Sequence, residues 1–398
     1  MQHDKLYAER MEMVKPSAIR ELLALANQPD VISFGGGFPD PTLFPTEKLI
    51  NVFTDVMRNN GGTALQYTSS DGLPSLRQKL CARMKKTGGV DCTIENLFIV
   101  QGGQQGMDLM AKLFINKGDV IITERPTFLG GLIAFNQYQP QYKCCSMDKD
   151  GMNMEELEQI LKTTKNVKFI YTIPDFQNPM GVCLSLERKK KMLELASKYD
   201  VMILEDTPYR EIRYEGEHIP TIKSMDKEDR VVFLGSFSKI LSPGMRLGWV
   251  VAPKEIAAKM VLLKMATDTQ CSTLNMCLVD RFMDMYNIDE HIEVLRSAYL
   301  RKRDVMLKTM KESFPASCSW TIPQGGLFTW LTMNPKLDSE KVMKERILPE
   351  ARAAYVPGAG FFPLDVEHNH ARVNYSCVPD EKIIEGISKM GAILKQLD

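Results

Sequence analysis

Short apolar runs alternate with amphipathic stretches through the middle of the chain. The runs are four to six residues long and rich in β-branched side chains, which is typical of strands buried on both faces. They lie at 96–100, 120–123, 167–172, 201–205, 231–235 and 248–252. Between them, 107–113 and 186–199 place apolar side chains at helical spacing. This order predicts an α/β fold with a mostly parallel central sheet and helices on both faces.

The pattern changes after about residue 290. A long charged stretch at 291–314 predicts a helix, and a Pro-Gln-Gly-Gly turn leads into a strand at 327–331. We therefore expect a smaller α+β domain at 290–398 beside a large domain at 46–289. Residues 1–45 are expected to form an N-terminal arm with a short lid helix, joined to the small domain.

Composition and charge exclude several kinds of partner. Lys plus Arg and Asp plus Glu number 50 each, so the net charge is zero and no nucleic-acid partner is expected. No apolar run approaches the ~18 residues that span a bilayer, so no membrane partner is expected. The nine cysteines show no metal-binding spacing, so no metal is expected. The adjacent Cys144 and Cys145 favour a reducing, cytoplasmic location.

One lysine is the leading candidate for chemistry. Lys239 follows the apolar run at 231–235, with Ser236 and Ser238 before it and Arg246 after a Pro-Gly turn. Two hydroxyls and a guanidinium at the end of a strand suit a phosphate dianion. A lysine beside that phosphate can form an imine with an aldehyde cofactor once its amine is deprotonated. A lone lysine there would ordinarily be a solvated surface residue, so its companions decide the interpretation.

The sequence Ser-x-Ser-Lys-x-x-x-Pro-Gly-x-Arg-x-Gly around Lys239 resembles the signature of fold-type-I enzymes that use pyridoxal 5′-phosphate (PLP), namely the class I and II aminotransferases. The resemblance extends from about residue 15 to residue 376. It is closest to the kynurenine and 2-aminoadipate (also aromatic) aminotransferases. It implies the PLP-dependent transferase fold type I, PLP as the cofactor, and Lys239 as the residue that holds it as a Schiff base.

The resemblance also assigns residues around the cofactor's ring. Asp206 matches the aspartate beside the pyridine nitrogen, where a carboxylate keeps that nitrogen protonated. Tyr209 and Asn178 match the pair that hydrogen-bonds the phenolic oxygen, and Phe128 matches the ring stacked on the pyridine. Glu205 is the rival acid, but alternation along the strand points it to the other side.

Further donors to the phosphate are expected from a glycine-rich turn. Gly103 and Gln104 lie at a strand-to-helix junction, where free backbone N–H groups and the helix dipole attract anions. The family often has a small hydroxyl residue at the position of Gly103, so this chain loses one side-chain hydrogen bond. Tyr67 matches a tyrosine that reaches the phosphate from the neighbouring subunit, which implies a homodimer with shared active sites.

Several residues bear on the substrate. Arg372 resembles the arginine whose forked guanidinium binds the substrate α-carboxylate, and Asn178 is assigned to the same substrate site. Gly36 belongs to a Ser-Phe-Gly-Gly-Gly run that lets the backbone approach the substrate. In the resembled subgroup a helix corresponding to 16–23 closes over the substrate, and its Arg20 can pair with a distal carboxylate. Four aromatic residues stay unassigned between core and pocket: Phe34, Phe38, Tyr138 and Phe362.

These roles imply an aminotransferase that moves the amino group of an L-amino acid to a 2-oxo acid, such as 2-oxoglutarate, by a ping-pong mechanism. Lys239 would carry the proton. The donor stays open among 2-aminoadipate, kynurenine, aromatic amino acids and alanine. A PLP-dependent β-lyase is the alternative enzyme, because the same lysine–aspartate frame serves β-elimination. The sensor domain of a transcription regulator is the alternative outside enzymes, but the short stretch ahead of Ser33 is expected to leave no room for a helix-turn-helix region.

Overall fold

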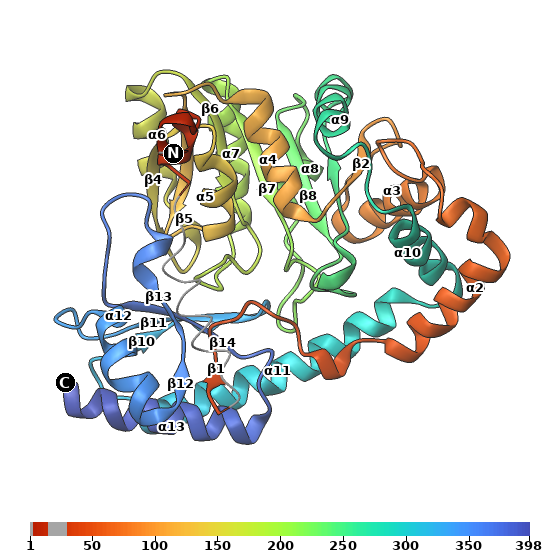
Figure 1. Cartoon of the computed structure of the whole chain (residues 1–398). Coiled ribbons are helices and arrows are strands. Elements are labelled where there is room, and N and C mark those ends of the chain that lie inside the picture. The colour runs from red at the N-terminus through yellow and green to blue at the C-terminus, as the bar shows by residue number, and fades with distance from the viewer. Residues whose placement is uncertain (1–2, 15–29) are drawn as a thin grey trace.

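The apolar runs of the sequence form one central sheet in the computed structural model, which describes residues 3–14 and 30–398 (Figure 1). Its eight strands have the order β2-β9-β8-β7-β6-β3-β4-β5. They are β2 (Leu97–Val100), β3 (Val120–Arg125), β4 (Gln141–Asp148), β5 (Gly151–Met152), β6 (Val167–Thr172), β7 (Met202–Asp206), β8 (Val231–Ser236) and β9 (Gly248–Val251). Strands β4, β3, β6, β7 and β8 are parallel, and β9 runs antiparallel to both β8 and β2. The predicted mostly parallel sheet is confirmed.

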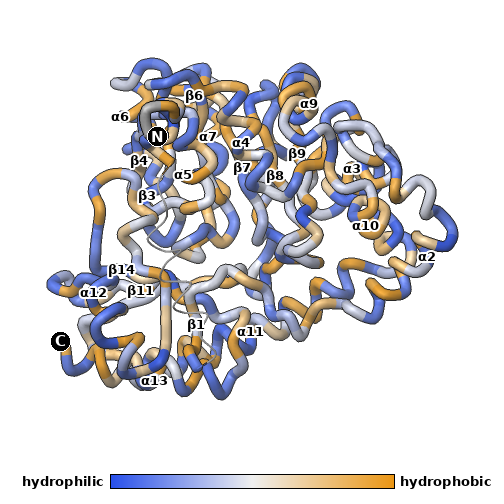
Figure 2. The backbone as a smooth tube through the Cα atoms, viewed as in Figure 1, coloured by the Kyte–Doolittle hydropathy of each residue, from blue (hydrophilic) through white to orange (hydrophobic). Residues whose placement is uncertain are grey.

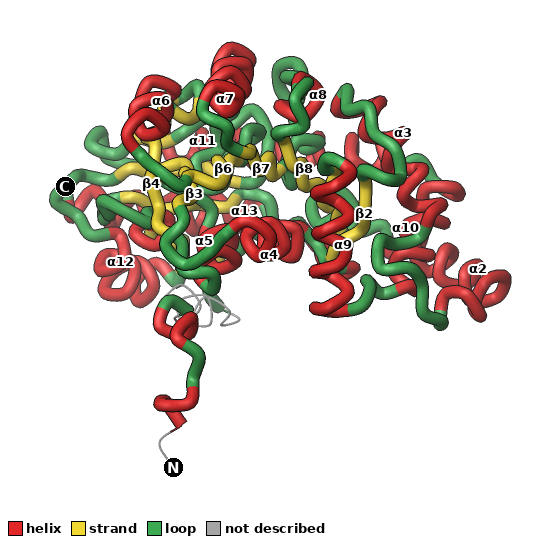
Figure 3. The backbone as a smooth tube through the Cα atoms, turned by 90° about the horizontal axis from the view of Figure 1, so that it is seen from above, coloured by secondary structure: helices red, strands yellow, loops and turns green. Residues whose placement is uncertain are grey.

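Helices cover both faces of this sheet. Viewed from above, α6, α7 and α8 lie on one side and α4 and α9 on the other (Figure 3). Apolar side chains of β3, β6 and β7 pack with those of α6 and α7 in one buried cluster. The helices of this part are α2 (Thr46–Ala64), α3 (Pro74–Gly88), α4 (Gly103–Phe114), α5 (Leu129–Asn136), α6 (Met154–Thr163), α7 (Leu186–Lys198), α8 (Ile222–Met225), α9 (Lys254–Asp268) and α10 (Thr273–Met285).

A second, smaller sheet forms in the C-terminal part of the chain. Its strands are antiparallel in the order β10-β11-β14-β13. Hydrophobic and hydrophilic residues alternate along the two long helices beneath it, α11 and α13 (Figure 2). The elements are α11 (Ile288–Ser313), β10 (Ser319–Trp320), β11 (Phe328–Thr332), α12 (Ser339–Val342), η5 (Met343–Ala351), β12 (Ala353–Ala354), β13 (Val356–Pro357), η6 (Gly358–Phe361), β14 (His370–Asn374) and α13 (Asp380–Leu397).

The N-terminal segment is tied to this C-terminal part. Strand β1 (Ile32–Ser33) pairs in parallel with β12, and Phe34 accepts a backbone hydrogen bond from Asn374. Short helical turns complete the described chain: η1 (His3–Leu6), η2 (Glu9–Glu12), η3 (Pro41–Leu43) and η4 (Pro243–Met245). The domain limits at residues 45 and 289 remain a prediction, which this pairing supports. The predicted helix at 16–23, with Arg20, lies outside the described residues.

Most predicted limits differ from the observed ones by one to three residues. Helix α11 begins at Ile288 rather than at residue 291, because the Asn287 side chain accepts a hydrogen bond from the Asp289 N–H and caps the helix there. Strand β3 continues to Arg125, two residues beyond its predicted end. Among residues 3–14 and 30–398, no helix has the length and apolar character needed to cross a membrane.

Candidate active site

The predicted site residues converge at one edge of the central sheet. Parallel strands place their carboxyl ends on the same edge, so the loops that follow β3, β6, β7 and β8 meet there. A cavity of about 410 Å³ lies between these loops and the C-terminal part. Its lining includes every predicted site residue in the described part of the chain except Tyr67: Gly36, Gly103, Gln104, Phe128, Asn178, Asp206, Tyr209, Ser236, Ser238, Lys239, Arg246 and Arg372.

Two acidic residues end strand β7 and point to opposite sides. Asp206 faces the cavity, is 4% exposed, and accepts a 3.1 Å hydrogen bond from the Tyr171 hydroxyl. Burial raises the pKa of Asp206 to about 7. Glu205 instead accepts hydrogen bonds from the backbone N–H groups of Ile222 and Lys223, away from the cavity. Strand alternation therefore places the two acids as predicted.

Lys239 lies in the loop after β8. Its Nζ donates a 2.6 Å hydrogen bond to the Gly37 carbonyl oxygen, and no described residue forms an ion pair with it. Burial lowers the pKa of Lys239 to about 8, and the positive charges of Arg372 and Arg246 act in the same direction. An amine with this pKa has an appreciable unprotonated fraction near neutral pH, as a nucleophile or proton acceptor requires.

Arg372 joins the two parts of the molecule at the cavity. It extends from β14 and donates from one nitrogen to the Asn178 amide oxygen (3.0 Å) and from another to the Gly35 carbonyl (2.8 Å). Its Nε is buried and has no protein partner among the described residues. The Asn178 amide nitrogen donates to the Tyr209 hydroxyl at 3.1 Å. The guanidinium therefore lies in a fixed orientation with donor capacity to spare.

Polar groups suited to a phosphate gather at the start of α4. The Ser236 and Ser238 hydroxyls are 3.0 Å apart, and the Arg246 guanidinium donates to the Gln101 carbonyl at 3.2 Å. Gly102 has a φ of 73°, in the left-handed region that favours glycine, and a Cβ atom there would lie 2.9 Å from an Arg246 nitrogen. With Gly103 as its first residue, α4 presents its positive N-terminal end to the same space.

These groups fit pyridoxal 5′-phosphate. The α4 N-terminus, the two serines and Arg246 suit its phosphate, and the Asp206 carboxylate suits a ring nitrogen that carries a proton. Phe128 lines the same cavity and offers an aromatic face. Lys239 provides the amine, and the guanidinium of Arg372, which lines the cavity, suits a substrate carboxylate. The individual roles of these residues remain predictions.

Among the described residues, one predicted site residue, Tyr67, does not reach the cavity in this chain. Tyr67 is 80% exposed and does not line the cavity, so a role at the phosphate requires the neighbouring subunit, as the resemblance implies. Arg20 lies outside the described residues.

The structure adds two residues that the sequence did not assign. Phe38 lines the cavity and is 59% exposed, whereas Phe34 is fully buried in the core. Tyr171 supports Asp206 through its hydroxyl. A tyrosine in a strand buried on both faces needs a polar partner for its hydroxyl, and that was the available signal.

Comparisons with known proteins agree with this geometry. The family model for aminotransferase class I and II matches residues 29–390. Aromatic-amino-acid aminotransferase 1 of Thermococcus litoralis is 39% identical over 400 aligned positions, which cover 100% of this chain and 95% of that protein.

Two solved structures are similar over the whole chain. The Pyrococcus horikoshii kynurenine aminotransferase, in complex with PMP, has a TM-score of 0.95 at 38% identity and covers 100% of this chain and 98% of its own. LysN, the α-aminoadipate aminotransferase of Thermus thermophilus complexed with N-(5′-phosphopyridoxyl)-L-leucine, has a TM-score of 0.92 at 31% identity, with 100% and 99% covered. The chain therefore belongs to the class I and II aminotransferases, and it is a PLP-dependent transaminase of the aromatic, kynurenine and aminoadipate subgroup.

Proposed function

We propose that this transaminase moves the amino group of 2-aminoadipate, an aromatic amino acid or a similar L-amino acid to a 2-oxo acid such as 2-oxoglutarate. One observation carries the proposal. Lys239 and Arg372 donate to the carbonyls of Gly37 and Gly35, two residues apart in one short segment. An amine and a guanidinium held this close together can act on one amino-acid backbone.

Each residue of the site has a separate task in this reaction. Bound PLP supplies an aldehyde and an electron-withdrawing ring. Arg372 binds the substrate α-carboxylate with its forked guanidinium and so fixes the Cα–H bond toward Lys239. Lys239, with its lowered pKa, would take the proton from Cα of the substrate and deliver it to C4′, the former aldehyde carbon of PLP. Asp206 holds a proton on the ring nitrogen, and Tyr209 and Asn178 hydrogen-bond the phenolic oxygen.

Both half-reactions use the same residues in turn, so the first product leaves before the second substrate binds. This ping-pong order predicts parallel lines in double-reciprocal plots of initial rate. The relatives differ in the donors that their names state, which is why we propose a group of donors rather than a single one. Phe38, which is exposed in the cavity, suits a donor with an apolar or aromatic side chain.

A donor panel with 2-oxoglutarate tests this function. We expect a change of the cofactor's absorption on donor addition without acceptor, and glutamate formation when the acceptor follows. If no amino acid changes the absorption, the proposed reaction is wrong. Release of pyruvate and ammonia in place of amino transfer would instead indicate the β-lyase.

Arg20 is the proposed determinant for donors with a second carboxylate. The change Arg20→Ala should raise KM for 2-aminoadipate and leave KM for leucine unchanged, because only the former offers a distal carboxylate for the guanidinium to bind. Equal changes for both donors would remove Arg20 from the specificity argument.

We also propose a cytoplasmic homodimer with shared active sites. The nine free cysteines support a reducing compartment. Exposed apolar side chains on α2 and just after it, namely Ile50, Phe53, Leu65 and Tyr67, support a partner on this face.

Mixing two inactive variants tests the sharing of sites. If Tyr67 serves the partner's site, a dimer of one Lys239→Ala chain and one Tyr67→Ala chain has one site with both defects and one intact site. Random reassortment should then restore about a quarter of the wild-type activity. No recovery after confirmed subunit exchange would show that each site is built from one chain.

A further inference from the structure

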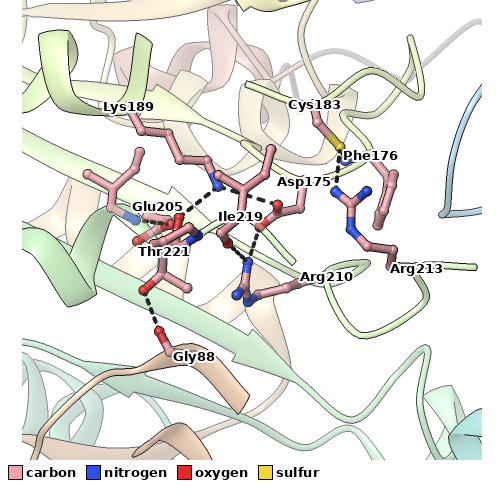
Figure 4. Close-up of polar contacts among 12 residues, drawn as sticks. Gly88, Asp175, Phe176, Cys183, Lys189, Glu205, Arg210, Arg213, Ile219 and Thr221 are labelled. Carbon is pink, nitrogen blue, oxygen red and sulfur yellow. Dashed lines mark hydrogen bonds and ion pairs between the residues drawn. The ribbon is translucent and has the colours of Figure 1, made fainter. Parts of the chain in front are cut away.

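Four charged residues are buried together on the side of β7 away from the cavity (Figure 4). Lys189 and Glu205 are 0% exposed, Asp175 is 1% exposed and Arg210 is 6% exposed. We call Asp175, Lys189, Glu205 and Arg210 the ionic cluster. None of them lines the cavity, and their elements are α7, β7 and the two loops that follow β6 and β7.

Asp175 is the centre of this cluster. Lys189 Nζ lies 3.4 Å from one of its carboxylate oxygens, and an Arg210 nitrogen donates to the other at 3.1 Å. The same two cations also donate to backbone carbonyls, Lys189 to Pro220 (3.1 Å) and Arg210 to Ile219 (2.7 Å). Burial raises the pKa of Asp175, but the Lys189 and Arg210 charges outweigh it and hold the pKa below its usual value.

Glu205 also holds the loop between β7 and α8, which contains Arg210, Ile219 and Pro220. Its two carboxylate oxygens accept hydrogen bonds from the N–H groups of Ile222 (2.8 Å) and Lys223 (2.7 Å) at the start of α8. The Thr221 hydroxyl just before them donates to the Gly88 carbonyl of α3. The loop between β7 and α8 is therefore held along its length by buried polar contacts.

Three members of the ionic cluster are close in sequence to a residue of the cavity. Glu205 directly precedes Asp206, Arg210 directly follows Tyr209, and Asp175 lies three residues before Asn178. The three residues expected around the cofactor's ring thus project from backbone whose opposite side carries the ionic cluster. A shift of any cluster member moves the backbone of its neighbour in the cavity.

The backbone between Asp175 and Asn178 adds a second, independent sign of constraint. Phe176 has a φ of 55°, in the left-handed region that a bulky residue adopts only when its surroundings impose it. Its ring lies under the Arg213 guanidinium, 4.6 Å from the ring centroid, and its N–H lies 3.4 Å from the Cys183 sulfur. This turn is held in one conformation by contacts on both sides.

Stability alone is a poor explanation for four buried charges. Replacing a buried ionic group by apolar residues of similar volume is often neutral or stabilising, because desolvation offsets the attraction between the charges. Conformational specificity is the remaining benefit. We propose that the ionic cluster orients Asn178, Asp206 and Tyr209 toward the cofactor, so that Lys189 and Asp175 are positioning residues for the transamination. This inference rests on the proposed roles of those three residues.

The test variant, Lys189→Met, removes the charge of Lys189 and keeps an unbranched side chain. Lys189→Met is compared with Arg77→Met, because Arg77 is also buried on a helix, α3, and pairs with an aspartate, Asp71, and neither residue lines the cavity. For Lys189→Met holoenzyme we expect cofactor dissociation on dilution to become about tenfold faster, the lower end of the effect seen when residues behind a metal ligand are lost. The pH midpoint of the cofactor's absorption should also shift. Arg77→Met should lose thermal stability with both readouts unchanged.

If Lys189 has only a structural role, Lys189→Met should unfold at a lower temperature but keep the dissociation rate and the absorption midpoint of the wild type. That result would overturn the proposal. If Lys189→Met does not fold, Asp175→Asn takes its place with the same readouts, because asparagine keeps the volume and an acceptor for Arg210. Lys189→Arg should restore both readouts, since it keeps the charge.

Asp206→Asn separates failure of this inference from failure of the assigned roles. If Asp206→Asn changes the absorption midpoint and Lys189→Met does not, only the positioning role is wrong. If neither variant changes it, the role of Asp206 at the ring is wrong as well.

Discussion

The two sides of strand β7 hold their charges in opposite ways. In the cavity, none of Asp206, Lys239, Arg246 and Arg372 forms an ion pair with a residue in the described part of the chain. In the ionic cluster, Asp175 is paired with both Lys189 and Arg210. Adjacent residues of one strand, Glu205 and Asp206, belong to the two sides.

The pKa values of Asp206, Lys239 and Asp175 follow this difference, whereas burial raises the pKa of Glu205, which forms no ion pair with a described residue, in the same direction as that of Asp206. Burial raises the pKa of Asp206 to about 7 and lowers that of Lys239 to about 8, so both shift toward their neutral forms. Paired Asp175 shifts the other way and is held ionised. Charged groups that form ion pairs within the protein hold the chain in one conformation. Desolvated charged groups without ion pairs remain available to a ligand and reactive near neutral pH.

The largest expected effect comes from removing the amine of the cavity. Lys239→Ala should abolish the absorption of covalently held cofactor and lower turnover by about 10⁴-fold, the upper end for a positioned proton carrier. Spectra and steady-state rates measure the two losses. The exposed lysine variant Lys198→Ala should match the wild type. A Lys239→Ala enzyme that transaminates at the wild-type rate would overturn the assignment of Lys239.

The next prediction exchanges each acid at the end of β7 for its amide. Asp206→Asn should lower turnover by about 10²- to 10³-fold, the range for losing one preorganised electrostatic partner. Its stability should be kept, because asparagine removes a desolvated carboxylate. Glu205→Gln should lower the free energy of unfolding by about 1–3 kcal/mol, since one of two buried N–H groups then faces an amide NH₂.

Denaturant unfolding and turnover, measured on both amide variants, decide the comparison. Glu205→Gln should retain at least about a tenth of the wild-type turnover, because it acts only through the backbone of its neighbour. If Glu205→Gln were the less active variant and Asp206→Asn the less stable one, the division between the two sides of β7 would be reversed.

The cavity was more accessible to sequence reasoning than the ionic cluster. Asp206, Lys239 and Arg246 lie at strand ends in motifs with fixed spacing, and parallel strands bring such ends together. Lys189, by contrast, sits in the run Arg-Lys-Lys-Lys of α7, which by itself predicts a solvated face. Lys189 can be buried because it pairs with Asp175. The two side chains come together only when the loop following β6 folds back against α7.

Other outcomes depend on contacts that no local pattern encodes. The central strands were predictable because β-branched runs buried on both faces differ from every other segment of the chain. Phe34 and Phe38 are four residues apart, yet one is in the core and the other is in the cavity. Nothing in their sequence neighbourhood separates them, because the surrounding glycines impose no periodicity. Tyr67 depends on a second chain, which a single sequence does not show.

The last prediction is a pH dependence that only the cavity side of β7, whose charges have no ion pairs, should produce. Lys239 must be unprotonated to attack the aldehyde of PLP, so the rate at which cofactor-stripped protein takes up PLP follows the unprotonated fraction. With the pKa lowered to about 8, that rate should rise by about tenfold per pH unit below pH 8 and level off above it. An ordinary lysine would give a rate that still rises to about pH 10. Stopped-flow absorbance between pH 6 and about 10 distinguishes the two profiles.

The midpoint of this uptake profile belongs to the cofactor-free protein and differs from the absorption midpoint of the holoenzyme. The uptake midpoint should be unchanged in Lys189→Met, because the ionic cluster contributes none of the charges that lower the pKa of Lys239. A shift of the uptake midpoint in Lys189→Met would mean that the two sides of β7 are coupled electrostatically, and the contrast between them would be wrong.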